Sequence, residues 1–321
     1  MKDFNLNKII KNIVYFIKFN YRKELLELKE ELNILDKEIR SLKLDLLYLK
    51  LMSYFETHSS KEYEKEINYL KKIGYITIFP YERIKSLPEI KATFDPEYKL
   101  PYILHESNKK LYFPKKYNLE QTKEKYRDYY ENENILGGGF TEKAPHQYQS
   151  DNVRVKKNDI VLDIGSAEAI FSLSIIDEAK KVYIFEMDND WIEPLQATFK
   201  PYKDKVTIVN KKVSNVNSDC EIRLDTLLLS EPEQGLFIKI DIEGSEYEVI
   251  KENESLLKSN FDIRISCCTY HKQDDADLIE KILIENGFQI EYSDGYMLFI
   301  YDDNIKPPYF RKGIIRAFKT K

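Results

Sequence analysis

Hydrophobic positions near the start of the chain follow two successive helical periods. Over residues 6–18, apolar residues fall on one arc of a helical wheel, while lysine, asparagine and tyrosine residues fall on the opposite arc. This pattern predicts an amphipathic helix with a basic polar face. Such a helix either lies on an anionic membrane surface or packs against the protein or a partner subunit.

A heptad pattern follows the amphipathic segment. Apolar residues recur at alternating spacings of three and four, which is the period of a coiled coil. Beside this stripe, acidic and basic residues would face each other across a parallel interface at three of four places. We predict that residues 25–49 join copies of the chain as a parallel coiled coil; a helix packed within one chain is the alternative. The stripe comprises Leu25, Leu28, Leu32, Leu35, Ile39, Leu42, Leu46 and Leu49.

Strand and helix patterns alternate from residue 159 onward. This alternation predicts an α/β fold, in which a mostly parallel sheet carries helices on both faces. The last two predicted strands would form an antiparallel hairpin across residues 293–295, at one edge of the sheet. The predicted strands occupy residues 160–164, 182–185, 206–209, 236–240, 262–266, 289–292 and 297–301.

Residues 59–150 carry a mixed pattern broken by prolines. It predicts a helix over residues 61–73, a hairpin built from residues 102–105 and 110–113, and a polar helix over residues 119–131. We therefore divide the chain into three parts. A helical oligomerisation region (1–58) and a capping or linker region (59–150) precede an α/β domain (151–321).

Composition narrows the classes of function. The net charge of −5 argues against a nucleic-acid binder, so we expect no nucleic acid as a partner. No apolar run is long enough to cross a bilayer. Three cysteines, Cys220, Cys267 and Cys268, form neither a disulfide framework nor a metal-ligand spacing, and we interpret them as reduced thiols. We expect a cytoplasmic protein that also contacts the inner face of the membrane if residues 6–18 dock there.

The ends of the predicted strands carry the chemistry, because ligands of such sheets bind at the carboxyl ends of the strands. Asp163 lies at the end of the first strand and Gly165 follows it, and Glu186 ends the second strand, where a carboxylate can hydrogen-bond both ribose hydroxyls. The chain lacks the GxGxxG pattern of a nicotinamide oxidoreductase. An acidic residue before a single glycine instead suits a cationic nucleoside, and S-adenosylmethionine is one. Asp241 ends the fourth strand.

These segments resemble the FkbM-type family of S-adenosylmethionine-dependent methyltransferases over residues 159–301. The resemblance rests on residues 161–165, 183–186, 224–228 and above all 239–246, Lys-Ile-Asp-Ile-Glu-Gly-Ser-Glu. It implies a seven-stranded class I methyltransferase fold and O-methylation of a glycan, sugar precursor or small metabolite. The cofactor contacts that it implies are Asp163, Gly165 and Glu186, and we add their neighbours Ser166, Ala167 and Met187. Ser166, Ala167 and Ala169 depart from the family's usual first loop.

Methyl transfer to an alcohol requires removal of the hydroxyl proton. His271, just beyond the fifth strand, is our candidate general base, and Asp241 is the second candidate. A divalent metal held by Asp241 with Glu243 or Asp225 is an alternative that we do not favour, so we predict no metal site. The alternative to an enzyme is a scaffold whose methyltransferase-like domain no longer catalyses. Residues 137–139, three consecutive glycines, form either a lid over the cofactor or a linker; in the lid interpretation His146 and Tyr148 lie near the cofactor.

Overall fold

The computed structural model describes residues 6–141, 145–231 and 235–319, and the chain divides into two compact units. One unit comprises residues 1–59 and 74–76, and the other comprises residues 60–73 and 77–321. We describe each unit by itself.

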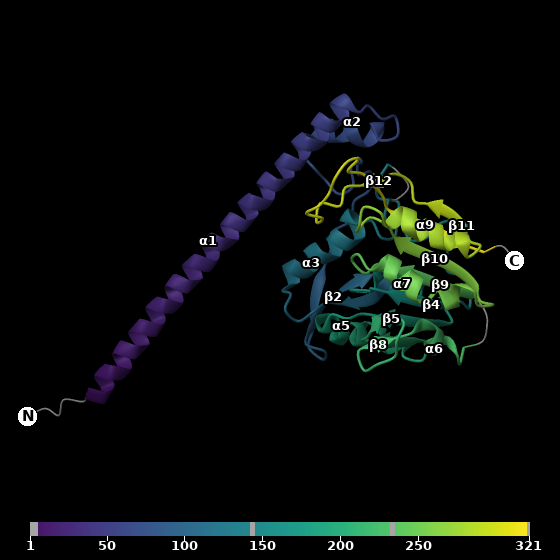
Figure 1. Cartoon of the computed structure of the whole chain (residues 1–321). Coiled ribbons are helices and arrows are strands. Elements are labelled where there is room, and N and C mark those ends of the chain that lie inside the picture. Colours follow the sequence, from purple (N-terminus) through teal and green to yellow (C-terminus); the bar gives the residue numbers. More distant parts are fainter. Residues whose placement is uncertain (1–5, 142–144, 232–234, 320–321) are drawn as a thin grey trace, which may run out of the picture. The chain divides into compact units, whose positions relative to one another are not determined.

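The first unit is built on one long helix, α1 (Leu6–Thr57), which contains both helical patterns predicted from the sequence (Figure 1). At about 1.5 Å per residue it is roughly 78 Å long. The eight apolar residues of the heptad stripe are exposed, from 47% for Leu25 to 68% for Leu42. The side chains of residues 6–18 lie outside the described part, so the membrane-docking interpretation stays a prediction. Within the described helices, none is both long and apolar enough to span a membrane.

The second unit is organised by a seven-stranded sheet in the order β11-β14-β10-β9-β4-β5-β6. All its strands run parallel except β14, which pairs antiparallel with both β10 and β11. This arrangement confirms the predicted class I methyltransferase fold. The strands are β4 (Ile160–Ile164), β5 (Lys181–Phe185), β6 (Val206–Val209), β9 (Gly235–Ile240), β10 (Asp262–Cys268), β11 (Gln289–Tyr292) and β14 (Ile314–Phe318).

The predicted position of the last strand is wrong. Residues 297–301 were expected to pair with β11, but β14 does so, with Tyr292 opposite Ile315. Tyr296–Met297 instead form the short strand β12, which pairs with β13 (Arg311–Lys312). The run over 297–301 is apolar because Leu298 packs in the interior. The charged residue Arg316 interrupts the apolar pattern of β14, so the sequence did not predict this strand. The buried guanidinium of Arg316 donates to the carbonyl oxygen of Gln147.

Successive side chains of β4 enter two hydrophobic cores, one on each face of the sheet. Val161 joins a core with α4 (Ile170–Ile175) and α5 (Asn189–Phe199), whereas Ile160 and Leu162 join the other. That second core also receives α6 (Leu224–Leu228), α7 (Glu246–Glu252), α8 (Glu254–Leu257) and α9 (Asp275–Glu285), and α7 packs beside α9 (Figure 1).

The segment from residue 78 to β4 packs on the first core. It contains the three-stranded antiparallel sheet of β1 (Ala92–Asp95), β2 (Leu100–His105) and β3 (Lys109–Tyr112), and α3 (Leu119–Arg127); α2 (Glu64–Ile73) precedes it in the chain. The predicted hairpin is β2–β3, and the structure adds β1. Phe79, Ile103 and Tyr126 share one core with Val161, so the boundary predicted near residue 150 falls inside this unit. The remaining short elements are η1 (Glu106–Asn108), η2 (Asp128–Asn132), η3 (Lys200–Tyr202), β7 (Lys212–Val213) and β8 (Glu221–Ile222).

Candidate active site at the carboxyl ends of the strands

The turns after β4 and β9 touch at Gly165. Its φ of +76° is left-handed, and a Cβ atom there would lie 1.8 Å from the carbonyl oxygen of Asp241. The amide of Asp241 in turn donates to the carbonyl oxygen of Ile164 at 2.9 Å. Only glycine allows this approach. The two turns therefore bring the end of β9 against the first loop.

A cavity of about 430 Å³ opens beside these turns. Of the predicted cofactor residues, Gly165, Ala167, Glu186 and Met187 line it, together with the ring of Trp191. The Glu186 carboxylate accepts hydrogen bonds from the amides of Ala167 and Asp188, each at 2.7 Å. These bonds fix the carboxylate at the cavity wall and leave further lone pairs for a ligand.

Two predicted cofactor residues lie elsewhere. Ser166 lines an adjoining cavity of about 250 Å³. Asp163 is fully buried and lines none of the cavities described here; it pairs with Lys239 at 3.0 Å and accepts a hydrogen bond from Ser172 at 2.7 Å. Lys239 also donates to the carbonyl oxygen of Gly165. In this geometry the Asp163 side chain holds the first loop through Lys239, and the side-chain cofactor contact stays a prediction.

A third cavity, of about 190 Å³, is also lined by Asp241. Asp241 and Glu243 line all three cavities, so the three spaces meet at the end of β9. The walls of this third cavity are mostly aromatic and apolar, with imidazole and carboxylate groups at one end. They comprise Ile78, Phe79, Glu133, His146, Tyr270, His271, Met297, Phe299 and Tyr301.

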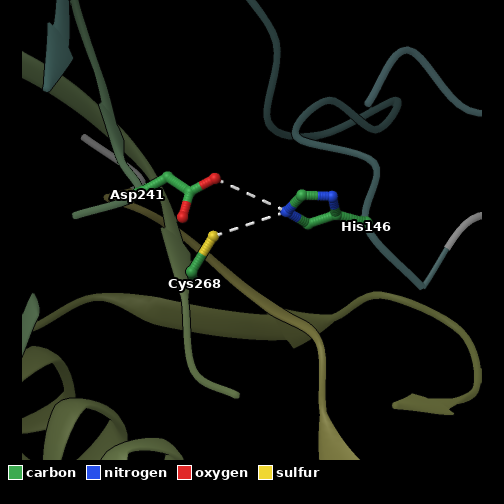
Figure 2. Close-up of side chains that lie close together, drawn as sticks. All are labelled: His146, Asp241 and Cys268. Atoms are coloured by element: carbon green, nitrogen blue, oxygen red, sulfur yellow. Dashed lines mark hydrogen bonds and ion pairs between the residues drawn. The ribbon is translucent and has the colours of Figure 1, made fainter. Parts of the chain in front are cut away.

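The carboxylate of Asp241 lies close to Tyr148, His146 and His271. Its Oδ2 accepts a hydrogen bond from the Tyr148 hydroxyl at 2.6 Å and lies 3.6 Å from His146 Nε2 (Figure 2). Burial alone would raise the pKa of Asp241, but the contacts with His146 and the charge of Lys239 outweigh it and hold that pKa well below its usual range. Asp241 is therefore a carboxylate at neutral pH and a poor proton acceptor.

His271 lies opposite, between two carboxylates. Its Nδ1 is 2.8 Å from Glu246 Oε1, and its Nε2 is 3.7 Å from Asp241 Oδ1. Burial would lower the pKa of the imidazole, but Glu246 and Asp241 outweigh it, so the pKa of His271 is raised. Glu246 also accepts the amides of Ile242 and Gly244, which fixes its position. The structure thus brings together both predicted catalytic residues, and their catalytic roles stay predictions.

Several residues of the site were not singled out by the sequence. The glutamates Glu133 and Glu168 line the adjoining cavity, and burial raises their pKa values to about 7 and about 8. Cys268 was interpreted as packing, yet its Sγ lies 3.7 Å from His146 Nε2. Cys267 faces the opposite core. The sequence did contain one indication of these residues. Side chains alternate along a strand, so Cys268 and Tyr270, two positions apart, are expected on the same face.

Two further expectations concern neighbouring segments. Asp225 pairs with Arg223 at 2.9 Å and lines none of the cavities described, so it does not join Asp241 in a metal site. Hydrogen bonds hold the last of the three glycines at 137–139. The carbonyl oxygen of Gly139 accepts a hydrogen bond from the amide of Ile84, and the amide of Gly139 donates to the side chain of Asn134. None of these glycines lines the three cavities.

Comparison with known proteins finds a family model that matches one of the segments forming this site. The model of the ribosomal RNA adenine dimethylase family matches residues 144–223, from the segment before β4 to β8. No curated protein matches the chain. The expectation that excluded nucleic acid as a partner is contradicted, because the family whose model matches acts on ribosomal RNA. Net charge misled because it averages over the chain, whereas phosphates are neutralised by local lysine and arginine residues.

Similar solved structures include methyltransferase FkbM from Methylobacillus flagellatus KT, at 18% identity and a TM-score of 0.40, covering 53% of this chain and 46% of that one. Another is SMU.1697c, a putative methyltransferase from Streptococcus mutans in complex with SAH, at 13% identity and a TM-score of 0.37, covering 53% and 92%. The 23S rRNA methyltransferase ErmE has 12% identity and a TM-score of 0.34, covering 53% and 65%.

This chain thus spans less than half of the FkbM structure, and these similarities carry no inference about the substrate. The match of the family model falls on β4, β5 and the turns after them, which form one wall of the 430 Å³ cavity and contain Gly165 and Glu186. The fold is therefore that of class I methyltransferases, and the segment that the family model matches forms part of the predicted cofactor site.

Proposed function

We propose that this protein is an S-adenosylmethionine-dependent methyltransferase that acts on a hydroxyl group of a glycan, a sugar precursor or another small metabolite, with His271 as the general base. The observation that carries the proposal is the position of His271 in the wall of the 190 Å³ cavity, which meets the cofactor cavity at Asp241. A hydroxyl is a weak nucleophile until its proton is removed, and an imidazole oriented by a carboxylate suits that task.

The cofactor cavity suits S-adenosylmethionine, which supplies an electrophilic methyl group when bound. Glu186 would hold the ribose hydroxyls, and the backbone at Gly165 allows close approach. Trp191 and Phe185 offer apolar surface to the adenine ring. The carboxylates of Asp241 and Glu243, where the cavities meet, suit a ligand that bears positive charge.

We call the 190 Å³ cavity beside His271 the acceptor cavity. It suits a small, partly apolar molecule. Rings of Phe79, Tyr270 and Phe299 line it, while polar groups gather at the end nearest Asp241. Proton removal falls to His271 Nε2, because Nδ1 faces Glu246 at 2.8 Å. Asp241, 3.7 Å from Nε2, would stabilise the imidazolium that forms.

RNA is the second candidate acceptor, and one observation favours it: the family model that matches residues 144–223 describes ribosomal RNA adenine dimethylases. Transfer of labelled methyl groups separates the two candidates. The purified protein is incubated with labelled S-adenosylmethionine and either glycans and sugar precursors or ribosomal RNA. Label in RNA and not in the hydroxyl compounds would contradict the proposed acceptor class and leave the enzyme class intact.

Glu186→Gln should weaken binding of S-adenosylhomocysteine by roughly tenfold to a hundredfold, because it removes charge-assisted hydrogen bonds worth about 1.5–3 kcal/mol. Isothermal calorimetry measures the change. The control is Glu193→Gln, an exposed change on α5 beside the surface residue Lys115, which should leave the affinity unaltered. If the wild-type protein binds no S-adenosylhomocysteine at millimolar concentration, the assignment of the cavity fails.

We also propose that α1 joins copies of the chain through the exposed stripe at residues 25–49, which fits a second copy of itself by spacing and by charge. Leu35→Lys with Leu42→Lys should lower the mass in light scattering to that of one chain, because each buried leucine contributes about 2–3 kcal/mol. Asn33→Lys with Ser41→Lys adds the same charge outside the stripe and should leave the mass unchanged. Equal masses for the two double variants would exclude this interface.

A further inference from the structure

Three different metal-ligand atoms converge behind the acceptor cavity. They are Nε2 of His146, from the loop before β4, Oδ2 of Asp241, after β9, and Sγ of Cys268, at the end of β10 (Figure 2). The imidazole nitrogen lies 3.6 Å from the carboxylate oxygen and 3.7 Å from the sulfur, and all three atoms lie within 4.8 Å of one another. Ligands that surround one zinc ion tetrahedrally at its usual bond lengths are roughly 3.3–3.7 Å apart.

The hydrogen bonds around these atoms orient them toward a cation. His146 Nδ1 lies 3.2 Å from the backbone carbonyl oxygen of Glu133, which can only accept, so Nδ1 is the donor to that carbonyl and Nε2 is the nitrogen that faces Asp241 and Cys268. A metal ion would take the place of a proton between Nε2 and the Asp241 carboxylate. A backbone carbonyl on Nδ1 is a usual support of a metal-binding histidine.

Neighbouring hydroxyl groups complete the surroundings. Tyr148 donates to Asp241 Oδ2 at 2.6 Å, which steadies the carboxylate as outer partners of metal ligands do. The Tyr270 hydroxyl lies 3.1 Å from His146 Nε2 and would turn aside when an ion binds. His146 and Cys268 are nearly or fully buried, so the site is shielded from bulk water.

We propose that His146, Asp241 and Cys268 bind one divalent transition-metal ion of the zinc type, with its fourth position open to the acceptor cavity. A nitrogen, oxygen and sulfur donor set favours zinc over magnesium or calcium, which prefer oxygen alone. His146 and Asp241 both line that cavity, which gives the ion a path of entry. The site differs from the combinations of Asp241 with Glu243 or Asp225 that were weighed and not favoured from the sequence.

The inference rests on the proposed function for its consequence but not for the binding itself. An ion open to the acceptor cavity would bind the acceptor hydroxyl and lower its pKa, so that His271 removes the proton more easily.

Cobalt(II) chloride is the probe, because a cobalt–thiolate bond gives a charge-transfer absorption band in the near ultraviolet. The full-length protein carries Cys220→Ser, which removes the exposed thiol, and is reduced and stripped with a chelator. We expect one cobalt ion per chain, displaced by zinc. Cys268→Ser should abolish the band, and His146→Gln should weaken cobalt binding at least tenfold. Cys267→Ser, the adjacent buried thiol on the other face, should retain both the band and the affinity.

Calorimetry with S-adenosylhomocysteine accompanies each variant and reports on the fold and the cofactor cavity. A protein that binds S-adenosylhomocysteine but gives no charge-transfer band overturns the metal inference and leaves the methyltransferase assignment intact. A protein that binds cobalt but not S-adenosylhomocysteine would support the metal inference and contradict the methyltransferase assignment. A band that survives in Cys268→Ser, or that Cys267→Ser removes equally, also overturns the inference. If Cys268→Ser does not fold, His146→Gln decides.

Discussion

Replacing His271 with glutamine should slow methyl transfer to the hydroxyl acceptor by roughly 10²–10⁴-fold while binding of S-adenosylhomocysteine is unchanged, because a positioned general base contributes about that factor. Glutamine keeps the size and polarity of the side chain but cannot take a proton. His271 lies outside the lining of the cofactor cavity, so the cofactor should not sense the change. Single-turnover kinetics with labelled S-adenosylmethionine measure the effect.

The pH dependence tests the same role more sharply. The base must be neutral to act, and the carboxylates beside it raise the pKa of His271 above its ordinary value of 6.5. The rate should therefore fall on the acidic side with a midpoint above pH 6.5. Glu246→Gln removes one of those charges, so the midpoint should move to lower pH. This decrease of the rate at acidic pH should be absent in His271→Gln.

The control for these experiments is His105→Gln, a second buried histidine, which contacts Tyr126 at 2.9 Å and lines none of the three cavities. It should leave the rate of methyl transfer and its pH profile as in the wild type. A rate for His271→Gln that stays within about threefold of the wild type, under conditions where chemistry limits turnover, would show that another group accepts the proton.

Gly165→Ala should abolish cofactor binding and destabilise the protein by roughly 2–6 kcal/mol, combining backbone strain of 1–3 kcal/mol with overpacking of 1–3 kcal/mol. The new Cβ would meet the carbonyl oxygen of Asp241 at 1.8 Å and the Ile242 side chain at 2.7 Å. Backbone atoms cannot rotate away as a flexible side chain can. The turn after β9 must therefore shift, and with it one wall of the cofactor cavity.

Gly287→Ala is the matched control, because its φ of +81° is nearly the same but a Cβ there would meet nothing within 4 Å. It should cost only the left-handed backbone, roughly 1–2 kcal/mol, and leave the affinity for S-adenosylhomocysteine unchanged. Urea unfolding gives both stabilities. Equal losses in the two variants would mean that the contact between the two turns does not constrain Gly165.

Patterns within single segments predicted most of the secondary structure. The heptad stripe and the amphipathic segment lie in α1, and six of the seven strands were located within one or two residues. The exception is β14, where Arg316 interrupts an otherwise apolar strand. Its guanidinium is satisfied by the carbonyl oxygen of Gln147, a residue far away in the sequence, so no local pattern could reveal that its burial is tolerated.

The site divides in the same way. Gly165, Glu186 and Asp241 were identified from the sequence because each follows its strand directly, and parallel strands bring their carboxyl ends to one edge of the sheet. Asp163 was identified because it lies near the carboxyl end of its strand, but only the tertiary structure shows that its carboxylate pairs with Lys239 away from the cofactor cavity.

The convergence of His146 and Cys268 on Asp241 was decided by packing alone. The first two residues are 122 positions apart in the chain, and their side chains meet because β10, β9 and the loop before β4 lie side by side in the fold. Sequence periodicity reports which face of an element is buried, since burial repeats with the local geometry of helix or strand. Which polar groups meet within that interior depends on contacts between distant segments, and those exist only once the sheet has formed.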